Sequence, residues 1–271
     1  MSVLKNKRHI SSLEFIRHYG IFYRYCREAF YKVPKRRQMY ICAELTRLLN
    51  EVYTNIMNLS DVIFAKTKEK ILIKQQCFNN ALNGIYDMQK PFLIYWNIQH
   101  TPFDKMCNVC DYLHREIVLL DGIMNKEKEN KDNIKYRKLV VLDWNKINQT
   151  KFLRNMCNLH RYTHGKVIRA SGKFNNCDTA LLISLADDAF FNVITANVCF
   201  PTNKEEYEIR KNKIDKAIRA LNHMQIPLMS FFNIMQYSNR IQEEWNKMIV
   251  DEIKMLRGLQ KSDKQRFGNL N

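Results

Sequence analysis

The chain has 271 residues, of which 44 are Lys or Arg and 27 are Asp or Glu, so its formal net charge is +17. Glycine and proline are scarce, at 7 and 5 residues, which argues against sheet-rich folds and favours long helices. The positive charge indicates an anionic partner, most simply RNA or DNA, while a basic surface that only confers solubility is the alternative.

The eight cysteines do not suggest a disulfide framework, because the chain is not short and shows no signal peptide. We expect reduced, mostly buried thiols. No apolar run approaches the roughly 18 residues that a membrane-spanning helix needs. The sequence therefore predicts a soluble, cytoplasmic protein.

The first half of the chain reads as four helices. A stripe of large side chains at spacings of three and four predicts a helix over about 12–32, with Ser11 and Glu14 forming a capping box at its start. A second helix is expected from Pro34 to about 63, and a third over about 66–99. Pro91 should kink or break the third helix, because proline removes one backbone hydrogen bond. A fourth helix should run from Thr101 to about 124.

The second half repeats the first. Met88-Gln89-Lys90-Pro91 recurs 136 positions later as Met224-Gln225-Ile226-Pro227, and Glu116 meets Glu252 at the same offset. Nearer the amino terminus the offset becomes 137. The repeat predicts helices over about 149–170, 177–199, 201–234 and 239–261, followed by a polar tail. The stretch 139–142 should be extended or form a short strand.

Two copies of four amphipathic helices joined by short loops predict an all-α fold of two tandem up-down four-helix bundles. Residues 1–127 form the first bundle with a basic amino-terminal arm, and 128–138 form a charged linker. Residues 139–271 form the second bundle with its polar tail.

Local signatures of catalysis are missing from the sequence. The seven glycines are scattered and form no phosphate-binding loop. Cys107, Cys110 and His114 have metal-like spacing, as do His160 with His164, but each set occurs in one copy only. We interpret them as core or surface residues and expect no catalytic residue, metal or cofactor. A metal-dependent enzyme built on these side chains is the alternative.

Basic residues gather in the amino-terminal segment, where residues 1–37 hold ten Lys or Arg against two Glu. Phosphate contacts from such a face would give salt-dependent binding that is largely independent of sequence. A solvated helix face is the alternative interpretation. The residues predicted from this charge to bind nucleic acid are Lys5, Lys7, Arg8, Arg17, Arg24, Arg27, Lys35, Arg36 and Arg37, together with Arg154 and Arg161 in the second copy.

Both ends of the chain resemble a known family. Ser2-Val3-Leu4-Lys5-Asn6-Lys7-Arg8, the spacing of the second and third helices, and the ending from Leu256-Arg257-Gly258 to Gln265-Arg266-Phe267 are similar to the accessory variability determinant family. These are four-helix-bundle proteins of diversity-generating retroelements, encoded beside a reverse transcriptase in bacteria and phages. The family's basic opening corresponds to Lys5, Lys7 and Arg8, and its basic ending to Lys261, Lys264 and Arg266.

The resemblance implies a non-catalytic accessory subunit that binds template RNA and the reverse transcriptase and supports mutagenic cDNA synthesis, with cDNA as a second candidate ligand. It also implies a homo-oligomer, although family members are single bundles in an odd-numbered ring, whereas a tandem chain supplies bundles in pairs. The alternative function is a helical adaptor that acts only through protein–protein contacts.

Overall fold

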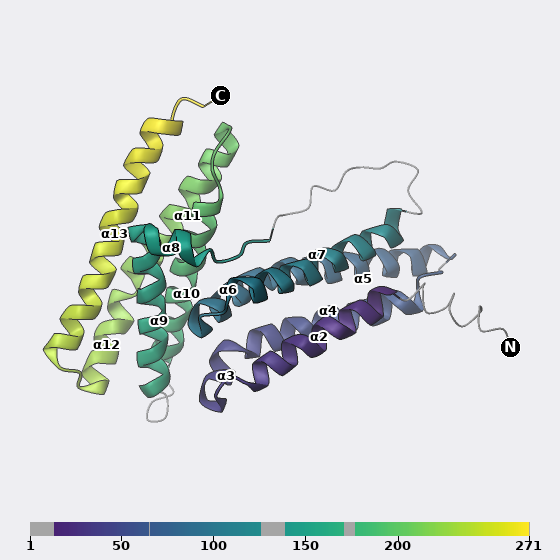
Figure 1. The fold of residues 1–271 in the computed structure, drawn as a ribbon, viewed down its shortest axis with the longest axis horizontal. Coiled ribbons are helices and arrows are strands. Elements are labelled where there is room, and N and C mark those ends of the chain that lie inside the picture. Colours follow the sequence, from purple (N-terminus) through teal and green to yellow (C-terminus); the bar gives the residue numbers. More distant parts are fainter. Residues whose placement is uncertain (1–13, 65, 126–138, 171–176, 271) are drawn as a thin grey trace. The chain divides into compact units, whose positions relative to one another are not determined.

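The computed structural model describes residues 14–64, 66–125, 139–170 and 177–270, and every regular element in these ranges is a helix (Figure 1). The chain divides into two compact units. The first comprises Met1–Tyr95 and Thr101–Val141, and the second comprises Trp96–His100 and Leu142–Asn271. The all-α prediction is confirmed for the described residues.

The helices of the first unit surround one core. Helix α2 packs against α4 and α7, and α5 contacts the same two helices. Their bounds are α2 (Glu14–Tyr31), α3 (Lys35–Ile41), α4 (Ala43–Asp61), α5 (Lys68–Asp87), α6 (Gln89–Gln99) and α7 (Phe103–Asn125). The end of α6, from Trp96, is assigned to the second unit.

The predicted stripe of α2 forms the centre of this core. Its five side chains are each 5% exposed or less, since a spacing of three and four places them on one helix face: Phe15, Tyr19, Phe22, Cys26 and Phe30. The hydroxyl of Tyr19 donates to the carbonyl of Leu49 at 3.1 Å, which gives this buried polar group a partner and joins α2 to α4.

Both long helices predicted after α2 are divided. Cys42 separates α3 from α4, and Met88 separates α5 from α6. The break at Met88 lets Pro91 lie in the first turn of α6, where a proline is tolerated because backbone N–H groups there have no helical partner. The predicted kink or break near Pro91 is therefore a break three residues upstream.

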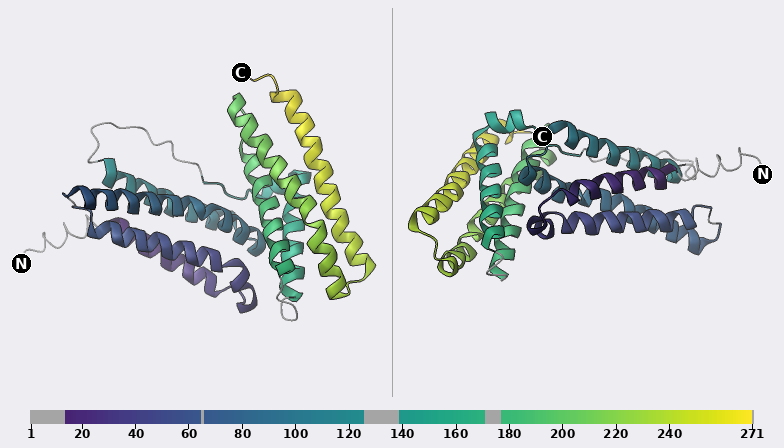
Figure 2. Two further views of the ribbon diagram at one scale, coloured as in Figure 1. Left: turned by 180° about the vertical axis from the view of Figure 1, so that it is seen from behind. Right: turned by 60° about the horizontal axis from the view of Figure 1, so that its bottom comes forward.

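The second unit repeats this order (Figure 2). Helix α9 packs against α10 and α13, and α11 contacts both α10 and α13. The bounds are α8 (Trp144–Gln149), α9 (Lys151–Ala170), α10 (Cys177–Val198), α11 (Lys204–His223), α12 (Gln225–Met235) and α13 (Asn239–Phe267).

The positions at which helices begin and end in the two units agree with the sequence repeat. Helices α5, α6 and α7 begin at residues 68, 89 and 103, and α11, α12 and α13 begin 136 residues later, at 204, 225 and 239. His100 follows α6 in a left-handed conformation with φ 51°, and Gln236 follows α12 with φ 49°. The repeat thus extends to the backbone geometry that ends the helix.

The predicted polar tail is wrong, because α13 continues to Phe267. The apolar periodicity fades near residue 261, but the later turns still bury side chains. Asp263 accepts a 2.6 Å hydrogen bond from Nε of the buried Arg210, and Phe267 packs edge-on against Phe200. These contacts hold the last turns of the helix in the second unit.

The connecting segment is described only from residue 139. Residues 139–143 form no strand; instead the side chain of Gln89 accepts from the Val140 N–H at 2.6 Å and donates to its carbonyl at 3.0 Å. A side chain thereby satisfies the backbone groups that a partner strand would have bonded. The predicted capping box at Ser11 and the linker 128–138 lie outside the described residues.

One helix departs from the expectation about membrane spans. Residues Thr179–Val198 of α10 are long and apolar enough to cross a membrane by length and composition alone. Half of that window is buried within the protein, and α10 packs against α9, α11 and α12. A core helix has the same properties.

Candidate nucleic-acid interface

An open groove of about 870 Å³ runs along α2 beside α4 in the first unit. It lies on the helix face opposite the buried stripe, and the three- and four-residue spacing that buries one set of side chains exposes the other. Its lining residues are Ile16, Arg17, Gly20, Ile21, Tyr23, Arg24, Arg27, Tyr31 and Tyr53.

Three predicted arginines come together here, and carboxylates do not neutralise them. Arg17 and Arg24 are exposed, and neither forms an ion pair with any residue in the described ranges. Arg27 donates to Thr46 Oγ1 at 3.4 Å and to the Tyr31 hydroxyl at 3.1 Å, and both acceptors are uncharged. The groove therefore presents a local positive potential to an anion.

Tyrosines alternate with these arginines. The guanidinium of Arg27 lies over the ring of Tyr31, 5.2 Å from its centroid, and Tyr31 is 70% exposed. The rings of Tyr23 and Tyr53 stack at 5.5 Å, and Tyr53 also stacks on the buried Tyr19. Aromatic rings held in this way, next to cationic side chains, suit both phosphate contact and base stacking. The sequence analysis missed Tyr53, since it lies on another helix.

The other basic residues predicted in the first unit lie beyond the groove lining. Lys35 and Arg37 are exposed on α3, after the turn at Pro34. Lys5, Lys7 and Arg8 lie outside the described residues, as does the side chain of Arg36.

The basic residues predicted in the second unit do not gather in one groove. Arg154 donates to the Asn148 carbonyl at 3.2 Å, and Arg161 donates to Asn158 Oδ1 at 2.7 Å and contacts His100. Both are thus engaged locally. The predicted basic residues on the final turns of α13 are exposed: Lys261, Lys264 and Arg266.

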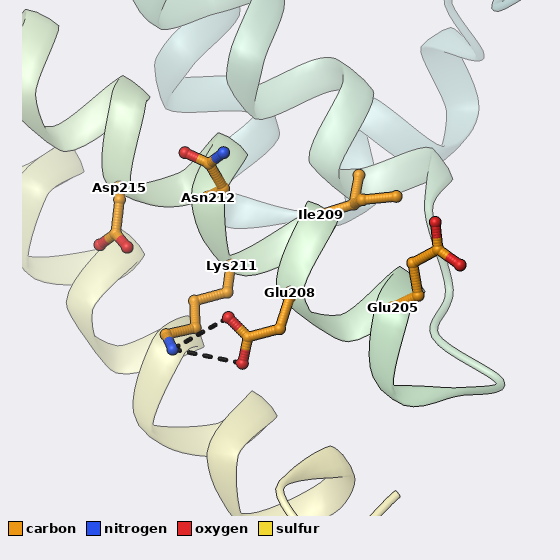
Figure 3. Close-up of a pocket in the computed structure, with 6 residues that line it drawn as sticks. All are labelled: Glu205, Glu208, Ile209, Lys211, Asn212 and Asp215. Atoms are coloured by element: carbon orange, nitrogen blue, oxygen red, sulfur yellow. Dashed lines mark hydrogen bonds and ion pairs between the residues drawn. The ribbon is translucent and has the colours of Figure 1, made fainter. Parts of the chain in front are cut away.

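A second surface hollow, on α11, has the opposite charge (Figure 3). Glu205, Glu208 and Asp215 line it, and Lys211 forms an ion pair with Glu208 at 3.2 Å. Three carboxylates against one lysine disfavour a phosphate backbone. The α11 face is therefore not a candidate for the same ligand.

Two residues of the groove lining, Tyr23 and Arg27, correspond to histidines of a buried cluster in the second unit. His160, His164 and Asp187 are found 137 positions after Tyr23, Arg27 and Asn50. Asp187 Oδ1 lies 2.8 Å from Nε2 of His160 and 2.7 Å from Nε2 of His164. Burial lowers the pKa of His160 to about 4, so its ring is neutral at pH 7. The sequence analysis paired the histidines but missed Asp187, which α10 supplies.

The cysteines described in the structure are free thiols. Burial raises the pKa of Cys157 to about 12 and that of Cys110 similarly, which keeps both sulfurs protonated. Cys107 and Cys110 are half-buried and His114 is exposed, and this trio is not among the described groups whose ligand atoms converge.

No protein-family model, curated protein or solved structure matches the chain significantly.

Proposed function

We propose that the protein is a non-catalytic nucleic-acid-binding subunit made of two tandem four-helix bundles, whose first bundle binds RNA along the α2 groove. The resemblance at its two ends extends the proposal to an accessory subunit of a diversity-generating retroelement. In that role it binds template RNA and the reverse transcriptase in the cytoplasm, as a homo-oligomer, and supports mutagenic cDNA synthesis.

One observation carries this proposal: Arg17, Arg24 and Arg27 share a groove with three tyrosines, of which Tyr31 is exposed, and without a carboxylate in its lining. Unpaired surface cations near one another are costly to the folded state through mutual repulsion. A polyanion relieves that repulsion and releases its own counterions on binding. Scattered surface lysines would explain solubility but not this arrangement.

The test compares arginines of equal charge in different surroundings. The double substitution Arg17→Gln and Arg24→Gln removes two uncompensated charges from the groove. The control Arg47→Gln changes another exposed arginine, on α4, whose guanidinium already pairs with Glu44 at 2.7 Å and with Glu51. Anisotropy of a labelled RNA then reports the affinity of each variant.

We expect the groove variant to weaken RNA binding and to reduce the slope of log K against log salt by about 2, one for each lost phosphate contact. Arg47→Gln should leave both unchanged. A loss of affinity in Arg47→Gln about half as large, on the logarithmic scale, as that of the groove variant would mean that net charge alone explains the effect, because the control removes one charge and the groove variant two. Unchanged affinity in the groove variant would contradict the assignment of the groove. Circular dichroism and a urea midpoint confirm that each variant is folded.

A protein adaptor is the second candidate, and exposed apolar side chains favour it. Ile226 and Met229 on α12 are 79% and 66% exposed, one turn apart on the same face. Such side chains suit a protein partner better than a phosphate backbone. Failure of the wild-type protein to bind RNA at low salt would favour this function.

A further inference from the structure

A cluster of two histidines and one aspartate lies inside the second unit, away from any role in RNA binding. His160 and His164 stand on successive turns of α9, and Asp187 comes from α10. The two imidazoles are at most 1% exposed, and the carboxylate is 17% exposed. One ligand atom from each residue lies within 4.8 Å of the others.

Within the described residues, the groups that meet the Asp187 carboxylate as ion-pair partners are the two histidines of the cluster. No Lys or Arg in the described ranges forms an ion pair with Asp187, whose carboxylate is met only by two imidazole N–H groups. A divalent cation would supply the missing positive charge. Burying a carboxylate without a cation is costly, which is why buried charges are usually paired or bound to metal.

Two buried polar atoms of the cluster have no hydrogen-bond partner within the described residues. Nδ1 of His164 and Oδ1 of Asn97 are buried, and neither has a partner in the described part of the chain. Nδ2 of Asn97 lies 2.9 Å from Nδ1 of His160. A 180° flip of the Asn97 side-chain amide would place Oδ1 beside Nδ1 of His160 instead. Oδ1 would then accept a hydrogen bond from Nδ1–H of His160, and the lone pair on Nε2 of His160 would be free to bind a metal. The flip gives up the 3.2 Å bond from Asn97 to the Cys157 carbonyl.

We propose that His160, His164 and Asp187 bind one divalent transition-metal ion of the zinc class and leave a further coordination position open. Two imidazole nitrogens favour zinc or a similar ion over magnesium or calcium, which prefer oxygen ligands. Two histidines four residues apart on a helix are a common ligand pair. Metal bonds of about 2.0–2.1 Å require ligand atoms roughly 3.3 Å apart, so Asp187 Oδ1 moves about half an ångström away from each imidazole Nε2 when the ion enters.

The first unit cannot hold the same ion, since its corresponding residues are Tyr23, Arg27 and Asn50. Arg27 brings a positive charge, and Tyr23 donates its hydroxyl proton to Asn50 Oδ1 at 2.8 Å. One chain should therefore bind one ion despite its repeat. This stoichiometry does not depend on the proposed RNA function.

The test uses the full chain, freed of metal with a chelator and titrated with Co²⁺ or Zn²⁺. Visible absorption of Co²⁺ reports its coordination, and calorimetry of Zn²⁺ reports stoichiometry and affinity. Asp187→Asn is the principal variant, because its amide oxygen still accepts from both imidazoles while the anionic ligand is lost. His164→Gln is the second variant and removes one nitrogen ligand. His223→Gln, on the exposed end of α11, and Cys107→Ser with Cys110→Ser are the controls.

We expect one ion per wild-type chain, affinity at least tenfold weaker in both ligand variants, and wild-type binding in both controls. The ion should raise the melting temperature of the wild-type protein and not that of Asp187→Asn. Absence of Co²⁺ binding by the wild type would overturn the site, as would undiminished binding by both ligand variants. Loss of binding in the cysteine control would place the ion on the thiols and overturn it equally.

Discussion

Nδ1 of His18 lies 2.7 Å from Oε2 of the buried Glu116. At the corresponding positions of the second unit, Nδ2 of Asn155 lies 2.8 Å from Oε2 of Glu252. His18 and Asn155 are 137 residues apart, and Glu116 and Glu252 are 136 apart, which are the two offsets of the sequence repeat. Each unit therefore buries one carboxyl group between its first and last long helices, and supplies a different side chain to hold it.

The repeat predicts which substitution the first unit tolerates. His18→Asn reproduces the pair found in the second unit and should cost less than about 1 kcal/mol in free energy of unfolding. His18→Leu fills the same space but leaves the 1%-exposed Glu116 carboxyl without this partner, and should cost about 2–3 kcal/mol. Urea unfolding at pH 7 measures both. Equal costs for the two variants would show that the hydrogen bond contributes nothing to stability.

The buried carboxyl of the second unit should make stability depend on pH. Burial raises the pKa of Glu252 to about 8, and the Asn155 hydrogen bond only partly opposes this. The folded state thus holds the proton more tightly than the unfolded chain. This contribution to stability is complete below the unfolded pKa of about 4.3 and is lost as pH rises through about 8.

Glu252→Gln removes that titration and keeps an oxygen to accept from Asn155. Between pH 5 and pH 8.5 the wild type should lose up to about 4 kcal/mol relative to this variant. Melting temperatures at the two pH values measure the difference. A gap between the proteins that is the same at both pH values would mean that Glu252 does not titrate in this range.

A pair of helices in each unit shows complementary residue sizes. A Cβ added at Gly84 on α5 would lie 2.6 Å from a methyl carbon of Val52 on α4. At the corresponding positions the second unit has Ala220 on α11 and Ala189 on α10. Gly84→Ala should destabilise the first unit by about 1–3 kcal/mol through overpacking.

Val52→Ala should relieve that clash, so the double variant should be more stable than the sum of the two single effects predicts. A double-mutant cycle measured by urea unfolding gives this coupling energy. Strict additivity would mean that α4 and α5 do not pack in this register.

Much of the helical arrangement could be predicted from the sequence, because hydrophobic spacing decides which face of a helix is buried. The stripe from Phe15 to Phe30 is buried as expected. The end of α13 was mistaken for a tail, because Asp263 is buried through a partner 53 residues away, Arg210. Charge and periodicity within one segment carry no information about such a partner.

The candidate sites, too, include residues that are distant in the sequence and could not be predicted from one segment alone. Arg17, Arg24 and Arg27 follow from the helical period of α2, and the structure places them in one groove. Tyr53 and Asp187 come from neighbouring helices, and their places depend on how those helices are rotated about their axes. Only the packed structure fixes that rotation.

The central claim is that the basic groove binds RNA through its phosphates, and its most direct test is the salt dependence of binding by the wild-type protein. The affinity for a structured RNA of a few hundred nucleotides is measured at about 50 and 200 mM salt. Several phosphate contacts predict a loss of the order of 10³ or more across that range. Absence of binding at both salt concentrations would contradict the claim and would mean that the positive charge only keeps the protein soluble.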